Sequence, residues 1–133
     1  MQDRFKFRVW HKKRKKMYDV LCLHTPTWSN GGEWVTVKGF NIITQQDIHI
    51  QIEPKDSIVL QCTGLKDKNG KLIYEGDIVK FRTELFGKPK QIIWDECHYI
   101  LKNTFIILCN SEIKQFGLEI IGNIYENPEL LED

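Results

Sequence analysis

The sequence predicts a mainly β protein with little helix. Apolar and polar residues alternate in several short stretches, as in residues 4–10, where Phe5, Phe7 and Val9 fall on one face of an extended chain. These stretches recur about every 8–12 residues and are separated by turn-forming Asn, Asp, Gly and Pro residues, a spacing typical of a β-barrel or β-sandwich. No long segment shows the apolar period of an α-helix.

The first half of the chain is expected to open with a β-hairpin. Residues 4–10 and 17–23 are its strands, and the polar link 11–16 is its tip. The Ser-Asn-Gly-Gly segment at 29–32 is turn chemistry, because Asn and Gly adopt positive φ at little cost. Further strands are expected over residues 34–37 (continuing toward 42–43), 44–52 and 58–62.

The second half begins with two expected turns, at residues 66–70 and 74–77. The first contains Asn69-Gly70, a strong signal for a tight turn. Helix is expected only as one turn near residues 111–116 and again at 127–131, where a proline suits a helix start. Strands are expected over residues 78–81, 91–94, 99–101, 105–108 and 118–125. Four glycines are expected to serve turns or bulges, and two aromatic residues to pack in the core: Gly64, Gly70, Gly76 and Gly122, with Trp94 and Tyr125.

The length of 133 residues suits one domain or two small subdomains. We expect an N-terminal β subdomain over residues 1–60, which carries the basic hairpin, and a second subdomain over residues 61–133. The longest apolar runs are only a few residues, far short of a membrane span, and the N-terminus lacks the apolar block of a signal peptide. A cytoplasmic protein without membrane contact is therefore expected, and its four cysteines are expected to be reduced thiols.

Charge is distributed unevenly although the net charge is only +1. Residues 1–16 contain eight basic residues and one acidic residue, whereas residues 17–133 contain 11 basic and 17 acidic residues. The N-terminal segment therefore carries +7 and the remainder −6. A basic cluster of this kind either contacts nucleic acid or forms a solvated hairpin tip.

Three segments of the chain resemble the YopX-like family of phage and prophage proteins. They are Phe5–Trp10 followed by Lys15–Tyr18, the central segment Thr63–Lys80, and the C-terminal segment Gly122–Leu131. The resemblance brackets nearly the whole chain, and residues 24–57 are its least family-like part. It implies that the N-terminal β part packs on a small, partly open barrel of the Src-homology-3 type. It supplies no activity, cofactor or catalytic residue, and fold alone does not give function.

Catalytic and metal sites have little support in the sequence. Cys97 and His98 are adjacent, and on a strand they would face opposite sides, so we expect no nucleophile–base pair between them. A Cys97 or Cys109 nucleophile with a distant histidine is left open. The sequential residues 95–98 make a poor ligand set on a strand. We therefore expect a non-enzymatic protein without cofactor or metal.

Two binding functions are left open. The first is capture of a host or phage protein, because a partly open barrel offers exposed edges and an aromatic groove. The second is binding of DNA or RNA through the basic hairpin, with Trp10 and Trp28 available for base stacking. The candidate protein-binding residues are Tyr74, Phe86 and Tyr99. The candidate nucleic-acid-binding residues are Arg4, Arg8, Lys12, Lys13, Arg14, Lys15 and Lys16.

Overall fold

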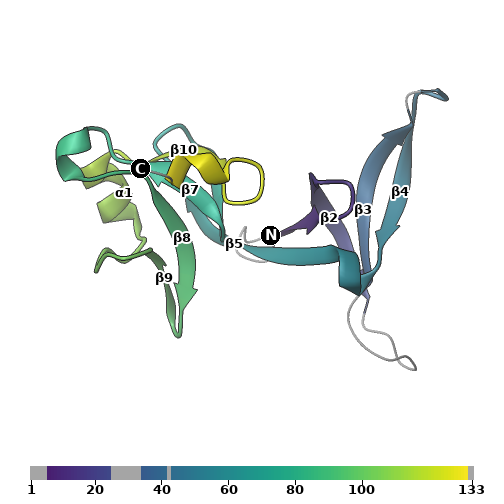
Figure 1. Cartoon of the computed structure of the whole chain (residues 1–133), viewed down its shortest axis with the longest axis horizontal. Coiled ribbons are helices and arrows are strands. Elements are labelled where there is room, and N and C mark those ends of the chain that lie inside the picture. The colour runs from purple at the N-terminus through teal and green to yellow at the C-terminus, as the bar shows by residue number, and fades with distance from the viewer. Residues whose placement is uncertain (1–5, 25–33, 42, 132–133) are drawn as a thin grey trace. The chain divides into compact units, whose positions relative to one another are not determined.

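The structure, a computed structural model, describes residues 6–24, 34–41 and 43–131 (Figure 1). These residues form two compact units. The N-terminal unit is Phe7–Leu60, and the C-terminal unit is Gln61–Asp133 together with Lys6. Within the described residues the fold is mainly β, as the sequence predicts, with strands in two sheets and one α-helix.

The N-terminal unit is an antiparallel sheet in the strand order β4-β3-β2-β1-β5. The fifth strand continues into the C-terminal unit, where it pairs with β6. The elements are β1 (Phe7–His11), β2 (Lys16–His24), β3 (Trp34–Asn41), β4 (Gln46–Ile52), the 3-10 turn η2 (Pro54–Asp56) and β5 (Ser57–Lys66).

One face of this sheet forms the core of the N-terminal unit. Its buried members come from four strands and follow the alternation of each strand. Val20, Ile50 and Val59 pack against them and are half-buried. The buried set is Val9, Tyr18, Val35, Val37 and Ile52.

The C-terminal unit contains a four-stranded sheet in the order β10-β7-β8-β9. Helix α1 contributes the buried Ile113 and ends at Gly117, whose φ of 58° is left-handed. The elements are β6 (Leu72–Tyr74), β7 (Asp77–Lys80), η3 (Glu84–Phe86), β8 (Lys90–Asp95), β9 (His98–Leu101), α1 (Asn110–Phe116), β10 (Glu119–Asn123) and η4 (Pro128–Leu131). The buried core is Ile73, Val79, Phe81, Ile92, Leu101, Leu108, Ile113 and Leu118.

Several expected elements differ in the structure. The expected strand 105–108 is reduced to a bridge between Ile107 and Ile100, and the short strand β6 was not expected. The helical turn after Ser111 is confirmed as part of α1, whereas residues 128–131 form a 3-10 turn. The expectation that Trp94 packs in the core is wrong: it lies near the end of β8, is not among the core residues, and its exposed fraction is 50%. The likeness to a Src-homology-3 barrel stays a prediction.

Among residues 6–24, 34–41 and 43–131, no helix has the length and apolar character needed to span a membrane.

Candidate functional site

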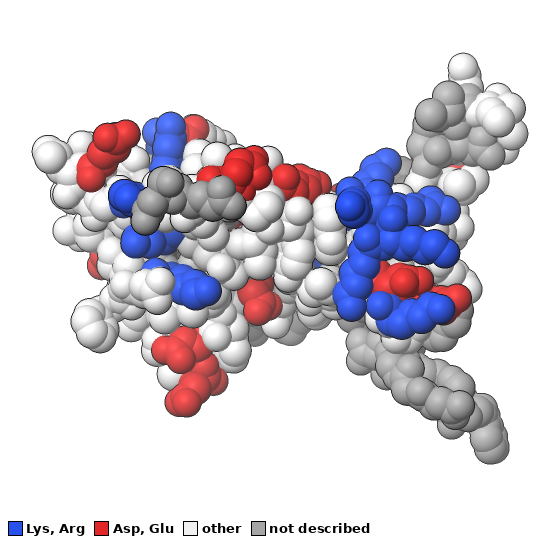
Figure 2. Space-filling view, in the orientation of Figure 1, with Lys and Arg blue, Asp and Glu red and all other residues white. Residues whose placement is uncertain are grey.

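The basic tip, Lys12–Lys16, projects from the hairpin between β1 and β2, and all five of its side chains are exposed. The turn closes through the Lys15 N–H, which donates to the His11 carbonyl at 2.8 Å, and it requires a left-handed Lys15 with a φ of 53°. Lys12 N–H donates to the Asp56 carbonyl at 2.8 Å, which fixes one side of the turn. Figure 2 shows Lys and Arg gathered near β2, with acidic atoms among them.

The other predicted nucleic-acid contacts are not part of this tip. Arg8 lies within β1, half-buried and directly across from Asp19 in the β1–β2 register. Trp10 is half-buried on the same strand. Arg4 and Trp28 lie outside the described residues. The structure therefore brings together five of the seven predicted basic residues.

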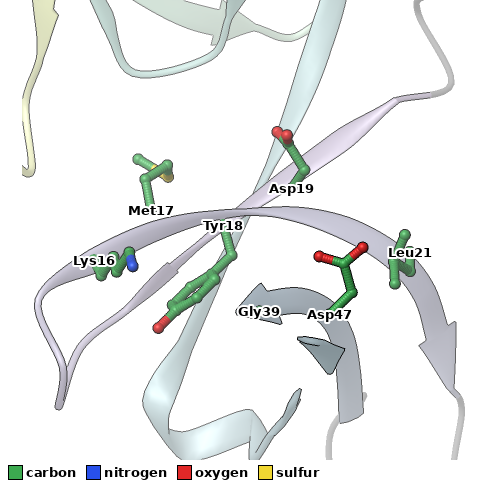
Figure 3. Close-up of a pocket in the computed structure, with 7 residues that line it drawn as sticks. All are labelled: Lys16, Met17, Tyr18, Asp19, Leu21, Gly39 and Asp47. Carbon is green, nitrogen blue, oxygen red and sulfur yellow. The ribbon is translucent and has the colours of Figure 1, made fainter. Parts of the chain in front are cut away.

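A pocket of about 500 Å³ lies beside the tip on the sheet formed by β2, β3 and β4 (Figure 3). Met17 and Asp19 project from one side of β2 and Tyr18 from the other, as the strand alternation requires. Its two carboxylates, on Asp19 and Asp47, would repel phosphate, so the pocket itself is unfavourable for a phosphate group. The lining residues are Lys16, Met17, Tyr18, Asp19, Leu21, Gly39 and Asp47.

A second surface lies in the C-terminal unit, on the sheet face opposite the core. Ile93 pairs with Ile100 across β8 and β9, and Ile100 bridges to Ile107. Directly opposite residues share one face, so the three isoleucines form a row that we call the apolar ladder. Ile93 and Ile100 are half-buried, and 48% of Ile107 is exposed. Phe105, two residues before Ile107, is fully exposed.

The opposite face of the same strands is packed. Ile92 and Leu101 are a register pair with no exposed surface, and they belong to the core of the C-terminal unit. These strands are thus apolar on both faces. A signal for this was present in the sequence, because the runs Ile92–Trp94 and Tyr99–Leu101 are each continuously apolar over three residues rather than alternating. We did not name the ladder residues as a site from the sequence, since such runs indicate buried strands equally well.

The predicted protein-binding residues lie in different clusters. Tyr99 packs edge-on against Trp94, with ring centroids 4.9 Å apart, and also contacts the core. Its burial, with smaller contributions from Glu75 and Cys62, raises the pKa of the Tyr99 phenol above 10.0. Phe86, in contrast, packs edge-on against Phe116, with centroids 5.3 Å apart.

Arg82 lies 5.5 Å from the centre of the Phe86 ring, and 43% of Phe86 is exposed. Tyr74 is half-buried in β6, where it pairs with Cys62. Phe86 and Tyr99 thus belong to separate aromatic groups, and only part of each is exposed.

The expectation that Cys97 and His98 stay apart is wrong. The Cys97 sulfur lies 3.0 Å from Nδ1 of His98. The alternation rule does not apply here, because Asp95 pairs with His98 and Cys97 therefore lies in the hairpin turn, after a left-handed Glu96. The pair is exposed, and no group of three His, Cys, Asp or Glu in the described part of the chain is close enough to hold a metal.

The three cysteines in the described part of the chain differ in their surroundings. Cys62 is buried, and Cys97 and Cys109, like it, form no disulfide. The Ser111 hydroxyl lies 3.2 Å from the Cys109 sulfur, and this contact, helped by nearby backbone N–H groups, lowers the pKa of the thiol.

The central segment 63–80 has a structural role. The carboxylate of Asp67 is buried and accepts three backbone N–H groups, from Asn69 and Lys71 at 2.9 Å and from Ile120 at 3.0 Å. Asp77 is also buried, and it accepts the N–H of Tyr74 at 2.8 Å. Both carboxylates close turns, so neither is presented to a ligand.

In the C-terminal segment 122–131, side-chain oxygens also accept backbone N–H groups and so close a turn. The side-chain oxygen of Asn123 accepts the N–H groups of Tyr125 and Glu126 at 3.0 and 2.9 Å. The side-chain oxygen of Asn127 accepts the N–H of Asn123 at 3.3 Å. A Cβ on Gly122 would lie 2.5 Å from that Asn127 oxygen, so a larger residue at position 122 would have to displace the Asn127 side chain. These residues therefore hold the end of β10 against the following turn.

Comparison with known proteins finds a family match and similar structures over nearly the whole chain. The family model described as "YopX protein" matches residues 6–132. The crystal structure of protein EF1440 from Enterococcus faecalis is 28% identical, covers 96% of this chain and 97% of that one, and superposes with a TM-score of 0.67. The crystal structure of protein yopX from Bacillus subtilis is 21% identical, covers 97% and 99% of the two chains, and has a TM-score of 0.56. A search of curated proteins found no match.

Proposed function

The chain belongs to the YopX family, and we propose that it is a non-enzymatic binding module that captures another protein through the apolar ladder. The partner is a protein of the bacterial host or of the phage. The setting is the host cytoplasm, where the chain acts as a phage or prophage accessory protein. The resemblance of the family segments to phage and prophage proteins supports that setting.

The observation that supports protein binding best is the two-sided apolar character of β8 and β9. A sheet face that meets only solvent normally carries polar residues. Here Ile92 and Leu101 serve the core, while Ile93, Ile100 and Ile107 form a second apolar row. Contiguous apolar surface of this kind marks interaction sites in soluble proteins.

The chemistry of the ladder indicates the kind of partner. Isoleucines in a row present a flat surface without hydrogen-bonding groups. Phe105, two residues before Ile107 in the chain, is fully exposed and is a large aromatic group of the type that dominates interface energies. Asp95 is the last residue of β8, and Lys102 follows the last residue of β9, so the two charges lie at opposite ends of this strand pair and supply a charged border. We infer a partner with an apolar patch and a polar rim.

A single charge on the ladder tests this function. The tagged chain is used for affinity capture from a lysate of the bacterial host, beside Ile107→Glu and the control Leu85→Glu. Leu85 has an exposed fraction of 93% and lies in η3, away from the ladder. We expect wild type and the control to retain the same protein, and Ile107→Glu to retain about tenfold less of it. Equal capture by all three chains would contradict the proposal.

Nucleic-acid binding is the second candidate, and the exposed basic tip favours it. Five adjacent cationic side chains on one turn, Lys12–Lys16, provide the phosphate contacts from which non-specific binding arises. The carboxylates in the adjoining pocket and the acidic C-terminal unit oppose it, so it ranks below protein capture.

A charge-matched pair of variants separates the tip from net charge. One variant replaces Lys12, Lys13 and Lys15 by Glu; the other replaces three exposed lysines of the C-terminal unit by Glu. The control set is Lys71, Lys102 and Lys114. If the tip binds single- or double-stranded DNA or RNA, a salt titration will show weaker binding and a flatter salt dependence in the tip variant alone. Equal losses in both variants would reduce the effect to bulk charge.

A further inference from the structure

Strand β4 ends the sheet of the N-terminal unit (Figure 1). It pairs with β3 on one side, and among the residues that the structure describes no strand pairs with its other side. Residues 46–49 and Gln51 are exposed, and 37% of Ile48 is accessible to solvent. An edge strand of this kind is a template for pairing with another strand.

β4 lacks the features that usually protect an edge. Its pairing with β3 runs without a register shift from Val35 opposite Ile52 to Asn41 opposite Gln46, so no bulge turns the edge away. The strand contains no proline and no lysine, and Asp47 is its only acidic or basic residue apart from His49.

The other sheet ends in the described chain are protected. β6 has three residues, β9 has four and is bridged by Ile107, and β10 has five with a register shift between Ile120 and Gly122. β4, with seven residues in unbroken register, is the longest regular edge. Its lack of protection is therefore specific to this strand.

The sequence of β4 is complementary to itself about His49. If two copies of β4 pair antiparallel with His49 on a two-fold axis, Ile48 lies opposite Ile50 of the second copy and Asp47 lies opposite Gln51 of the second copy. Each Asp47 is then diagonal to His49 of the other chain, and no two like charges from carboxylates or lysines face each other. A two-fold interface requires this kind of self-complementarity.

The apolar side of such a pair continues an existing core. Ile50 and Ile52 pack with the core of the N-terminal unit, and Ile48 lies on the same face because residues two apart along a strand share a face. Pairing with a second copy would cover the exposed part of Ile48 with Ile50 of that copy. The edge thus offers both backbone hydrogen bonds and apolar burial to a second β4.

We propose that this chain forms a homodimer through antiparallel pairing of β4 with β4 about His49, which joins two N-terminal units into one continuous sheet. This surface is separate from the apolar ladder, so the dimer does not depend on the proposed function.

Sedimentation velocity over micromolar to millimolar protein tests the dimer. Wild type is expected to show concentration-dependent dimerisation. Ile48→Lys, which places a charge opposite Ile50 of the second copy, raises the dimer dissociation constant by about tenfold or more. The control Ile43→Lys makes the same change at a residue with 94% exposure before β4 and leaves the constant unchanged. A wild-type monomer at every concentration, or equal effects of both changes, would overturn the proposal.

A cysteine in place of His49, on the proposed two-fold axis, tests the register of pairing. This test does not depend on whether Ile48→Lys still folds. Residues directly opposite in an antiparallel pair have Cα atoms about 4.5–5.5 Å apart, a separation that a disulfide spans. In a chain whose Cys22, Cys97 and Cys109 are replaced by Ser, we expect His49→Cys to form a reducible covalent dimer under mild oxidation. The same Ser-substituted chain without the new cysteine, or with Ile43→Cys instead, should form none. A dimer in solution without this cross-link would contradict pairing about His49.

Discussion

Asp67, in the central segment 63–80, stabilises the fold through its carboxylate. Its two oxygens accept N–H groups from its own turn and from β10, which is distant in the sequence. A carboxylate that is buried and fully hydrogen-bonded stabilises the groups around it, and its removal leaves several buried donors without acceptors. Asp67 therefore acts in folding, because it holds its own turn and β10 together.

The first prediction concerns this carboxylate. Asp67→Ala leaves three N–H donors without their acceptor and is expected to lower the free energy of unfolding by about 3 kcal/mol. Urea unfolding followed by circular dichroism measures the loss. Asp95→Ala, at the exposed end of β8, is the matched control and should change stability by less than about 0.5 kcal/mol. Similar values for both variants would show that the Asp67 contacts add nothing.

The second prediction is a pH dependence from Glu119. The Asn69 amide donates to its carboxylate at 3.1 Å, and Lys80 and Lys68 lie at 3.3 and 3.6 Å. The amide hydrogen bond first, and then Lys80 and Lys68, lower the pKa of Glu119 below 4.5. A carboxyl whose pKa is lowered by folding adds stability above its ordinary pKa, and this stability is lost as the pH falls through the lowered pKa.

Glu119→Gln should therefore be less stable than wild type at neutral pH by a small amount, because these ion pairs are exposed. The difference between the two proteins should shrink as the pH falls below about 4.5. Unfolding in urea from pH 7 to pH 3 measures both curves. A difference that stays constant over this range would contradict the role given to the carboxylate.

Among the elements, alternation and turn chemistry gave the most reliable predictions. The hairpin of β1 and β2 was predicted from the alternation in residues 4–10 and the polar link after it. The basic tip followed directly, because five consecutive basic residues cannot be buried. β6 was missed because Leu72–Tyr74 is short and lies between two turns, where propensity gives little signal.

The apolar ladder required tertiary information. The runs Ile92–Trp94 and Tyr99–Leu101 show that both faces of β8 and β9 are apolar, but the sequence does not say which face meets the core. Register decides this, because Ile92 and Leu101 pair on the packed side and Ile93 and Ile100 on the other. The exposure of Trp94 could not be predicted from the sequence either, because the apolar run 92–94 does not show which of its members the core covers.

The third prediction concerns the turn after β10. Gly122 has no room for a Cβ, because one would lie 2.5 Å from the Asn127 oxygen and 2.8 Å from Leu130 Cδ1. Moving Asn127 breaks its hydrogen bond from Asn123, so Gly122→Ala should lower the free energy of unfolding by about 1–3 kcal/mol. Thermal unfolding measures the stability of this variant and of the control Val20→Ala. The first adds a methyl group where there is no room, and the second removes volume from a half-buried side chain.

A specific readout separates the two effects. Amide hydrogen exchange at Asn123 and Glu126 should accelerate in Gly122→Ala and stay unchanged in Val20→Ala, since only the former disturbs the closing contacts. Unchanged exchange at both residues would contradict the steric role of this glycine.

At the scale of the molecule, charge is divided between the two units. Phe7–Leu60 contains eight basic and five acidic residues, a net charge of +3, whereas residues 1–6 and 61–133 together contain 11 basic and 13 acidic residues, a net charge of −2. The cationic tip and the apolar ladder belong to different units. Mutations in the cationic tip therefore leave the residues of the apolar ladder unchanged, and the two binding functions can be tested separately.

Site-specific photo-cross-linking tests the central claim, capture of a protein by the apolar ladder, most directly. A photoreactive residue is placed at Ile107 in the ladder or at Leu85 outside it, and the chain is irradiated in the bacterial host. We expect one discrete cross-linked protein from position 107 that is absent from position 85. No product at position 107, or the same products at both positions, would contradict protein capture through this surface.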